Sequence, residues 1–172
     1  MDPHDAEPRT TSLPGAELLR DAETGLLGRA AWDTLLAAES ARCARYGRVT
    51  TVVFMEVAGP DEISAVWGEQ VGARAVTRMA TELGRQSRTS DLVGRLGPRQ
   101  FGILLPETDE VAAVNYVERT RAACLDALRT AGSTDRVRFG WADANRRRTL
   151  LAAAEVARTR LASDETEGEE PA

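Results

Sequence analysis

Residues 50–57 constrain the fold of this chain more than any other segment. Their sequence, TTVVFMEV, is short, rich in β-branched residues and apolar at nearly every position. A strand with one solvated face alternates apolar and polar residues, whereas a continuous apolar run is typical of a strand buried on both faces. A sheet with two buried faces needs helices on both sides, so this segment predicts a central strand of an α/β domain.

The rest of the chain supplies elements that fit around such a strand. Apolar residues at helical spacing predict helices over about 29–46, 61–65, 71–86, 110–129 and 149–162. Thr108 or Asp109 is the expected cap of the fourth helix. Further strands are predicted at 91–96, 100–105 and 137–142. Only three residues separate the strands at 91–96 and 100–105, so these two strands are predicted to form an antiparallel hairpin. Helical crossovers between the other strands favour parallel neighbours. The hairpin and the crossovers together predict a mixed sheet.

The domain organisation follows from length and composition. A chain of 172 residues suffices for one domain with one core, here residues 15–162. Residues 1–14 are polar and rich in Pro, and residues 163–172 hold five acids and no base, so both are predicted to be disordered tails. The acidic tail accounts for the net charge of −5. The body is close to neutral, which argues against a nucleic-acid partner.

Composition also limits location and chemistry. No run of 18 apolar residues and no secretory signal is present, so a cytoplasmic protein without a membrane partner is expected. The only histidine, His4, lies in the N-terminal tail, which removes a histidine base or a histidine-built zinc site from the domain. Cys43 and Cys124 lack metal or redox spacing and are read as small buried apolar residues.

Four short motifs stand in order along the chain. They are DAETGLLGR at 21–29, RYGR at 45–48, SDLVGRLG at 90–97 and FGILLP at 101–106. Together they span about residues 16–162 and resemble the GGDEF family of diguanylate cyclases. The resemblance implies a nucleotidyl-cyclase-like fold, with a central mixed sheet of the five-strand type flanked by helices and the signature β-hairpin at 91–105.

Active members of that family join two GTP molecules into cyclic di-GMP, and the resemblance therefore implies a metal site to look for. Two magnesium ions need carboxylate ligands there. The first falls on Glu56. The second falls on Arg99, because the family's signature Gly-Gly-Asp/Glu-Glu-Phe is replaced by Gly97, Pro98, Arg99, Gln100 and Phe101. A cation there repels metal ions, and a proline fixes φ and removes an N–H.

Other positions that the resemblance assigns to GTP also differ. The guanine-reading residues fall on Ser64 and Ala73, and the phosphate-binding lysine falls on Val156; only Arg160 keeps its charge. These replacements predict a protein that is not an enzyme, holds no catalytic metal and needs no magnesium. For Glu56 two readings stay open, residual metal binding or a strand-end acid with another partner.

The family's second, product-binding site has residues that match in this sequence. Its Arg-x-x-Asp motif corresponds to Arg88 and Asp91, which end five residues before Gly97. A further family arginine falls on Arg119, with Arg121 as a nearby alternative. Guanidinium groups can bind guanine O6 and N7 or clamp a phosphate, and a carboxylate accepts guanine N–H groups. The alternative is that these residues bind no ligand. In that case Asp91 only begins a strand, Arg88 is a solvated arginine at a helix end, and Arg119 pairs with a neighbouring acid.

Three hypotheses follow. The first is an inactive GGDEF-like receptor that binds cyclic di-GMP through Arg88, Asp91 and Arg119, in which the ligand bridges two protomers and an unidentified protein receives the signal. The second is a ligand-independent interaction module that uses the remodelled turn or the acidic tail. The third is GTP binding through Glu56 and Arg160 without cyclisation.

Overall fold

The computed structural model describes residues 19–58, 61–130 and 136–164, with the backbone alone over 61–73. Its helices are α1 (Arg29–Tyr46), α2 (Asp61–Gln86), α3 (Glu110–Thr130) and α4 (Leu150–Ser163). Its strands are β1 (Thr50–Ala58), β2 (Leu92–Arg95), β3 (Gln100–Pro106) and β4 (Arg136–Ala144). The predicted tails lie outside the described residues, except for Ser163 and Asp164.

The predicted elements are confirmed, with one correction. The helices expected at 61–65 and 71–86 are a single helix, α2. The residues between them, VWGEQ, contain no proline, and one glycine inside a helix costs only about 1 kcal/mol relative to alanine. At the start of α3 the cap is Asp109, whose Oδ1 accepts the N–H of Ala112 at 2.7 Å. Thr149 caps α4 in the same way.

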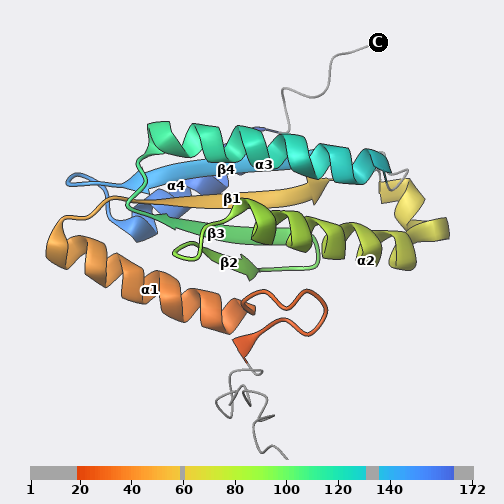
Figure 1. The fold of residues 1–172 in the computed structure, drawn as a ribbon, viewed down its shortest axis with the longest axis horizontal. Coiled ribbons are helices and arrows are strands. Elements are labelled where there is room, and N and C mark those ends of the chain that lie inside the picture. The colour runs from red at the N-terminus through yellow and green to blue at the C-terminus, as the bar shows by residue number, and fades with distance from the viewer. Residues whose placement is uncertain (1–18, 59–60, 131–135, 165–172) are drawn as a thin grey trace, which may run out of the picture.

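The sheet corrects a second expectation, that of a mixed, five-strand-type sheet. It has four strands in the order β2-β3-β1-β4, and every hydrogen-bonded pair of these strands is antiparallel. The helical crossovers do join parallel strands, β1 to β2 and β3 to β4, but a third strand lies between the two members of each pair. This is the split β-α-β arrangement, and Figure 1 shows its order. Parallel pairing is found in the described residues at an isolated bridge between Leu27, which precedes α1, and Gly94 of β2.

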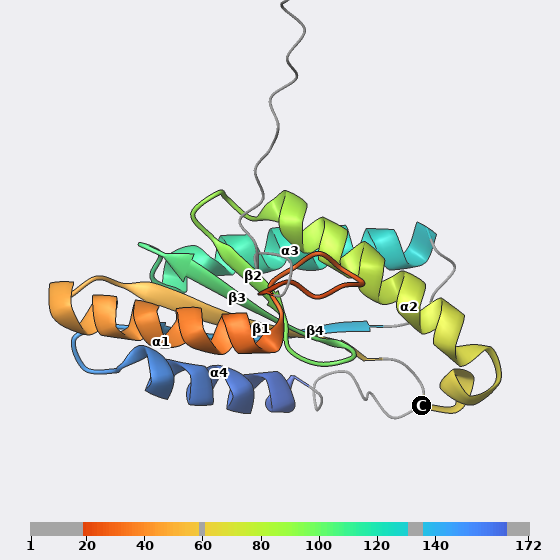
Figure 2. The ribbon, with the colours of Figure 1, turned by 90° about the horizontal axis from the view of Figure 1, so that it is seen from below.

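Helices cover both faces of the sheet. α2 and α3 pack on one face and α1 and α4 on the other, as the two perpendicular ribbon views show (Figures 1 and 2). Val53, Met55 and Val57 of β1 belong to the core beneath α2 and α3, while Val52 and Phe54 belong to the core beneath α1 and α4. The apolar run of β1 is therefore buried on both faces, as its sequence predicted.

One edge of the sheet, β4, is covered by side chains instead of another strand. Arg121 Nη1 donates to the carbonyl of Val137 at 3.1 Å, and Asp164 Oδ2 accepts the N–H of Phe139 at 3.0 Å. Further along, Arg160 Nη1 donates to the carbonyl of Trp141 at 2.6 Å. An uncovered edge is a template for pairing with another chain, so these side chains protect the strand.

None of the helices in the described part of the chain combines the length and the apolar character that a transmembrane segment requires.

Candidate nucleotide-binding site

The signature hairpin ends in a tight turn that lies against the end of β1. The N–H groups of Leu96 and Gly97 both donate to the carbonyl of Gln100, at 2.8 and 3.3 Å. The carbonyl of Arg99 accepts the N–H of Val57 at 3.0 Å. Register places Gln100 directly opposite Glu56. The turn and the expected metal carboxylate are therefore neighbours, as the family resemblance predicted.

A single arginine holds the turn in place from inside the hairpin. Arg95 donates from Nε to the carbonyl of Gly97 at 3.2 Å and from Nη2 to the carbonyl of Pro98 at 3.0 Å. Its Nη1 forms ion pairs with Asp21 and Glu23. Only 15% of the Arg95 side chain is exposed, so these charge-assisted bonds form in a partly desolvated place. Arg95 thus ties the turn to the segment that precedes α1.

The DAETGLLGR motif forms the loop to which Arg95 is tied. Asp21 Oδ1 accepts the backbone N–H of Thr24 at 2.9 Å and its hydroxyl at 2.7 Å. Burial raises the pKa of Asp21, but the bonds from Thr24 and Arg95 outweigh it, and the net pKa lies below the usual value. Gly25 has a φ of +69°, a backbone conformation that favours glycine. The loop then docks on β2, because Leu27 accepts the N–H of Arg95 at 2.8 Å.

Glu56 has a cationic partner. Arg138 Nη2 donates to its Oε2 at 2.8 Å, and Gln100 Nε2 lies 3.4 Å from its Oε1. Both charged side chains are mostly buried, with 26% of Glu56 and 17% of Arg138 exposed. They lie in a pocket of about 260 Å³ between β1, the turn and α4, which we call the turn pocket. Its lining also includes Arg29 and Arg158.

Two of the other positions assigned to GTP, Val156 and Arg160, are not part of the lining of this pocket. Ser64 and Ala73 lie in the part of α2 whose side chains are outside the described residues. Val156 packs partly buried against the core under α4. Arg160 turns to the β4 edge, where it binds Glu110 and the carbonyl of Trp141. Of the positions assigned to metal and GTP, the structure brings together Glu56 and the turn residues.

The Arg-x-x-Asp motif forms the connection between α2 and β2. Asp91 Oδ2 accepts the backbone N–H of Arg88 at 2.7 Å, and the N–H of Asp91 donates to the carbonyl of Arg88 at 3.0 Å. These reciprocal bonds close a tight turn. The side chain of Arg88 is exposed, and within the described residues it forms no hydrogen bond or ion pair.

Arg119 approaches the same connection from α3. Its Nε donates to Gln86 Oε1 at 2.8 Å, and its Nη2 donates to the carbonyl of Gln86 at 3.1 Å. Its guanidinium also lies 5.7 Å from the ring centroid of Tyr116. The hydroxyl of Tyr116 is 2.9 Å from Ser87 Oγ, and burial raises the pKa of this tyrosine. Only Ser87 lies between Gln86 and Arg88, so the structure brings these predicted residues to one connection.

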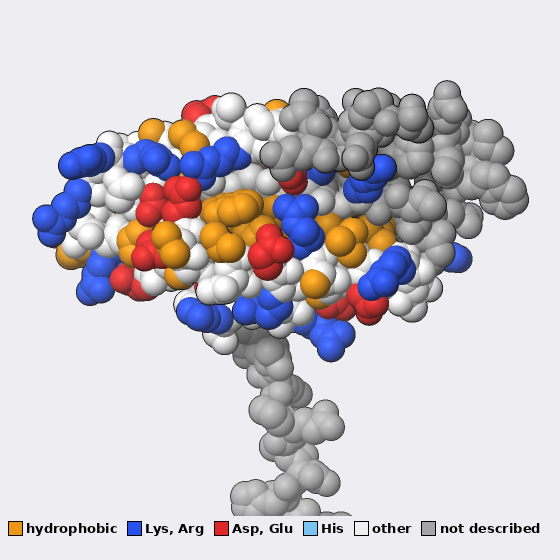
Figure 3. Space-filling view, turned by 90° about the horizontal axis from the view of Figure 1, so that it is seen from above, with side chains coloured by type: hydrophobic (Ala, Val, Ile, Leu, Met, Phe, Trp, Pro, Cys, Tyr) orange, Lys and Arg blue, Asp and Glu red, His pale blue; other side chains and the backbone are white. Residues whose placement is uncertain are grey.

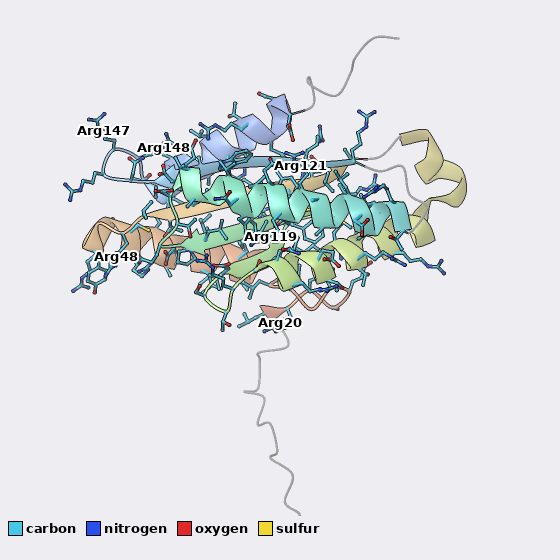
Figure 4. All side chains as sticks on the ribbon, turned by 45° about the horizontal axis from the view of Figure 1, so that its top comes forward. Arg20, Arg48, Arg119, Arg121, Arg147 and Arg148 are labelled. Atoms are coloured by element: carbon cyan, nitrogen blue, oxygen red, sulfur yellow. The ribbon has the colours of Figure 1, made fainter. Side chains whose placement is uncertain are left out.

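Arg121, the alternative to Arg119, is placed elsewhere. It leaves α3 on the side of β4, where it bonds Val137 and pairs with Asp164 at 3.4 Å (Figure 4). Its guanidinium lies 5.0 Å from the ring centroid of Phe139. Arg119 therefore lies at the connection between α2 and β2 and Arg121 does not, since residues two apart on a helix do not share a face.

Sequence reasoning missed two residues of the turn pocket, Arg138 and Arg158. Arg138 pairs with Glu56 because β4 lies next to β1 in a register that places the two residues opposite each other. Arg158 lies over the ring of Phe54, 4.7 Å from its centroid. Neither residue belongs to a local motif, and only the strand pairing and the packing of α4 bring them to the pocket.

The split β-α-β core, the helices on both faces and the turn beside the end of β1 define the chain as a nucleotidyl-cyclase-like domain. The family described as "Diguanylate cyclase, GGDEF domain" matches residues 18–169, so the chain belongs to the GGDEF family. Among curated relatives, the "Probable diguanylate cyclase DgcC" of Escherichia coli K12 is 30% identical over 129 residues, which are 73% of this chain and 34% of that protein. The chain thus spans about a third of this relative's length.

Solved structures agree on the fold. The GGDEF domain of DgcB from Caulobacter crescentus, in complex with c-di-GMP, superimposes with a TM-score of 0.76 at 18% identity, over 88% of this chain and 92% of that one. Diguanylate cyclase SiaD from Pseudomonas aeruginosa, in complex with its activator SiaC, gives a TM-score of 0.77 at 26% identity, over 88% and 60%.

Proposed function

We propose that this GGDEF domain is a cyclic di-GMP receptor without cyclase activity, and that it binds its ligand through Arg88, Asp91 and Arg119. The observation that carries the proposal is the convergence of these residues on the connection between α2 and β2. Arg119 reaches it through two hydrogen bonds to Gln86, and Asp91 closes it. Two residues of the connection and one residue of α3, which follows the hairpin in the sequence, thus support the proposal together.

The chemistry of these groups suits a guanine dinucleotide. The exposed guanidinium of Arg88 is available to pair with guanine O6 and N7 or with a phosphate. Gln86 orients Arg119, which keeps N–H donors on Nη1 and Nη2 for a ligand. Asp91 supplies an acceptor for guanine N–H groups. The structure of the DgcB GGDEF domain in complex with c-di-GMP supports this ligand class.

The surroundings of the turn support the absence of cyclase activity. Arg99 stands where the family places a metal carboxylate, and the Glu56 carboxylate is engaged by Arg138. A magnesium ion beside Glu56 would meet the guanidinium group of Arg138. Repulsion between a divalent ion and an arginine about 4 Å away amounts to several kcal/mol at intermediate dielectric. The proposed receptor therefore works without magnesium.

The test is isothermal titration with cyclic di-GMP. Wild type should bind, while Arg88→Ala and Arg119→Ala should each bind about tenfold to a hundredfold more weakly, because each loses a bidentate contact. Arg85→Ala is the matched control, since Arg85 is an exposed arginine in the last turn of α2 and is paired with Glu82. No heat with wild type, or equal affinity for all four proteins, refutes the receptor.

Catalysis is tested separately. Incubation with GTP and Mg²⁺ or Mn²⁺ should yield no cyclic di-GMP by chromatography, and product formation would refute the proposed inactivity. Light scattering with and without cyclic di-GMP tests whether the ligand bridges two protomers, as a dimer present only with ligand would indicate.

The structure of SiaD with its protein activator SiaC favours a second candidate, a protein-binding module that needs no nucleotide. In that case the exposed turn residue Pro98 is the contact, held by its carbonyl bond to Arg95. Thermal unfolding separates the two, because a ligand of the native state raises Tm. A shift with cyclic di-GMP favours the receptor, whereas an unchanged Tm favours the module. GTP binding through Glu56 and Arg160 is disfavoured, since Arg160 pairs with Glu110.

A further inference from the structure

A second cavity lies at the end of the sheet opposite the remodelled turn. It occupies about 420 Å³ between the last turns of α1 and the connection from β4 to α4. Its polar lining includes Ser40, Arg48, Asn145, Arg146, Arg147 and Arg148. Thr50 at the start of β1 pairs with Ala144, which places this cavity at the far end of β1 from Glu56. We call it the arginine pocket.

The arginine pocket carries an excess of positive charge. Within the described residues, the exposed side chains of Arg146 and Arg147 form no hydrogen bond or ion pair. Arg148 Nη1 is buried, has no hydrogen bond within the described residues, and forms an ion pair with Glu110 at 3.6 Å. Arg48 is paired with Glu107 at 3.2 Å. Two guanidinium groups, those of Arg146 and Arg147, are thus left for an added anion.

The pictures show the same concentration of charge. Arg48, Arg147 and Arg148 gather at one end of the molecule, although Arg48 follows α1 and the others precede α4 (Figure 4). Seen from the side of α3, basic side chains line this end, beside a group of acidic ones (Figure 3).

The connection that carries the arginines has a fixed backbone. Asn145 Oδ1 accepts the N–H of Arg147 at 2.9 Å, and Asn145 and Arg148 exchange backbone hydrogen bonds at 2.9 and 3.1 Å. The first turn of α4 follows at once, and a helix start adds partial positive charge to the pocket wall. The arginines therefore extend from a preorganised support, which lowers the entropic cost of binding.

We propose that the arginine pocket binds a phosphorylated small molecule that carries at least two negative charges, either a phosphate monoester or a diphosphate. Guanidinium groups match phosphate oxygens in bidentate geometry, and the two positive charges left by Arg146 and Arg147 call for a dianion. The volume lies within the ~300–1,000 Å³ of small-molecule pockets. A concave site walled by α1 favours a compact anion over the flat surface of a bilayer or a row of nucleic-acid phosphates.

The test uses inorganic pyrophosphate and ribose 5-phosphate as probes, titrated at about 0.15 M ionic strength, where long-range attraction is screened. Wild type should bind at least one probe saturably. The double variant Arg146→Ala/Arg147→Ala should bind at least about tenfold more weakly, because two charge-assisted contacts are lost. The control Arg85→Ala/Arg129→Ala removes the same charge from exposed arginines of α2 and α3 and should bind like wild type.

Amide NMR shifts locate the site independently of affinity. Saturable shifts centred on residues 145–151 support the proposal. Absence of binding, equal weakening in both double variants, or binding to anionic vesicles without binding to either probe overturns it. Arg88→Ala should leave pyrophosphate binding unchanged, so this pocket and the proposed cyclic di-GMP site fail or stand separately.

Discussion

Removing the carboxylate of Asp164 tests the covering of the β4 edge. Asp164 Oδ2 accepts the N–H of Phe139 at 3.0 Å and pairs with Arg121 at 3.4 Å, and a quarter of its side chain is exposed. A hydrogen bond to a charged group contributes about 1.5–3 kcal/mol net, which partial exposure reduces to about 1–2 kcal/mol here. Asp164→Ala should therefore lower the free energy of unfolding by about 1–2 kcal/mol. For a domain of this size the corresponding loss in Tm is about 2–8 °C.

Urea unfolding followed by circular dichroism gives this quantity. Asp164→Asn keeps an acceptor for Phe139 but loses the charge, so its unfolding free energy should fall between wild type and the alanine variant. Asp126→Ala is the surface control, because the Asp126 carboxylate on α3 is 73% exposed and such pairs contribute less than about 1 kcal/mol. If Asp164→Ala unfolds at the same urea concentration as Asp126→Ala, the side chain does not cap the edge and the reasoning is wrong.

Two further predictions concern packing and acid stability. Gly140→Ala should lower the free energy of unfolding by about 3 kcal/mol in urea, because its methyl group would collide with the backbone of α4, including Leu161 Cα at 2.8 Å; a loss below 1 kcal/mol would contradict this close approach. Bonds from Arg42 and Thr50, working against burial, lower the pKa of Glu39 below 4.5. Glu39 therefore stabilises the fold above about pH 4.5, and this contribution is lost as the pH falls through its folded pKa. In a plot of the free energy of unfolding against pH, the curve of Glu39→Gln should be flatter than that of wild type below about pH 4.5. Parallel curves for the two proteins would refute this prediction.

Local patterns were sufficient to predict most elements of the fold, whereas the sheet required long-range pairing. The apolar run of β1, the hairpin at Gly97 and the cap Asp109 act within a few residues, and the structure confirms them. Parallel neighbours were expected because helical crossovers join parallel strands. The neighbour of β1 is instead β3, and hydrogen bonds between strands far apart in sequence decide that order.

The candidate site divides in the same way. The replacements at the turn can be read directly from the sequence, but the partner of Glu56 cannot, because Arg138 is 82 residues away and opposes it only through strand register. The spacing of Arg119 and Arg121 already shows from the sequence that only one of them can face α2. A separation of two residues along a helix corresponds to a rotation of about 200°, so the two side chains lie on different faces of α3.

The contacts that hold the hairpin turn are distinct from the groups that would perform catalysis. The hydrogen bonds from Arg95 and Val57 engage only the backbone carbonyls of Gly97, Pro98 and Arg99. Their strength does not depend on which side chains stand at the tip of the turn. A GGDEF domain built in this way can exchange its tip residues and keep its fold. It also keeps the connection between α2 and β2, since the bonds that close it share no residue with the turn. This independence is the physical basis of the proposed function, in which the ligand site does not depend on the residues at the tip of the turn.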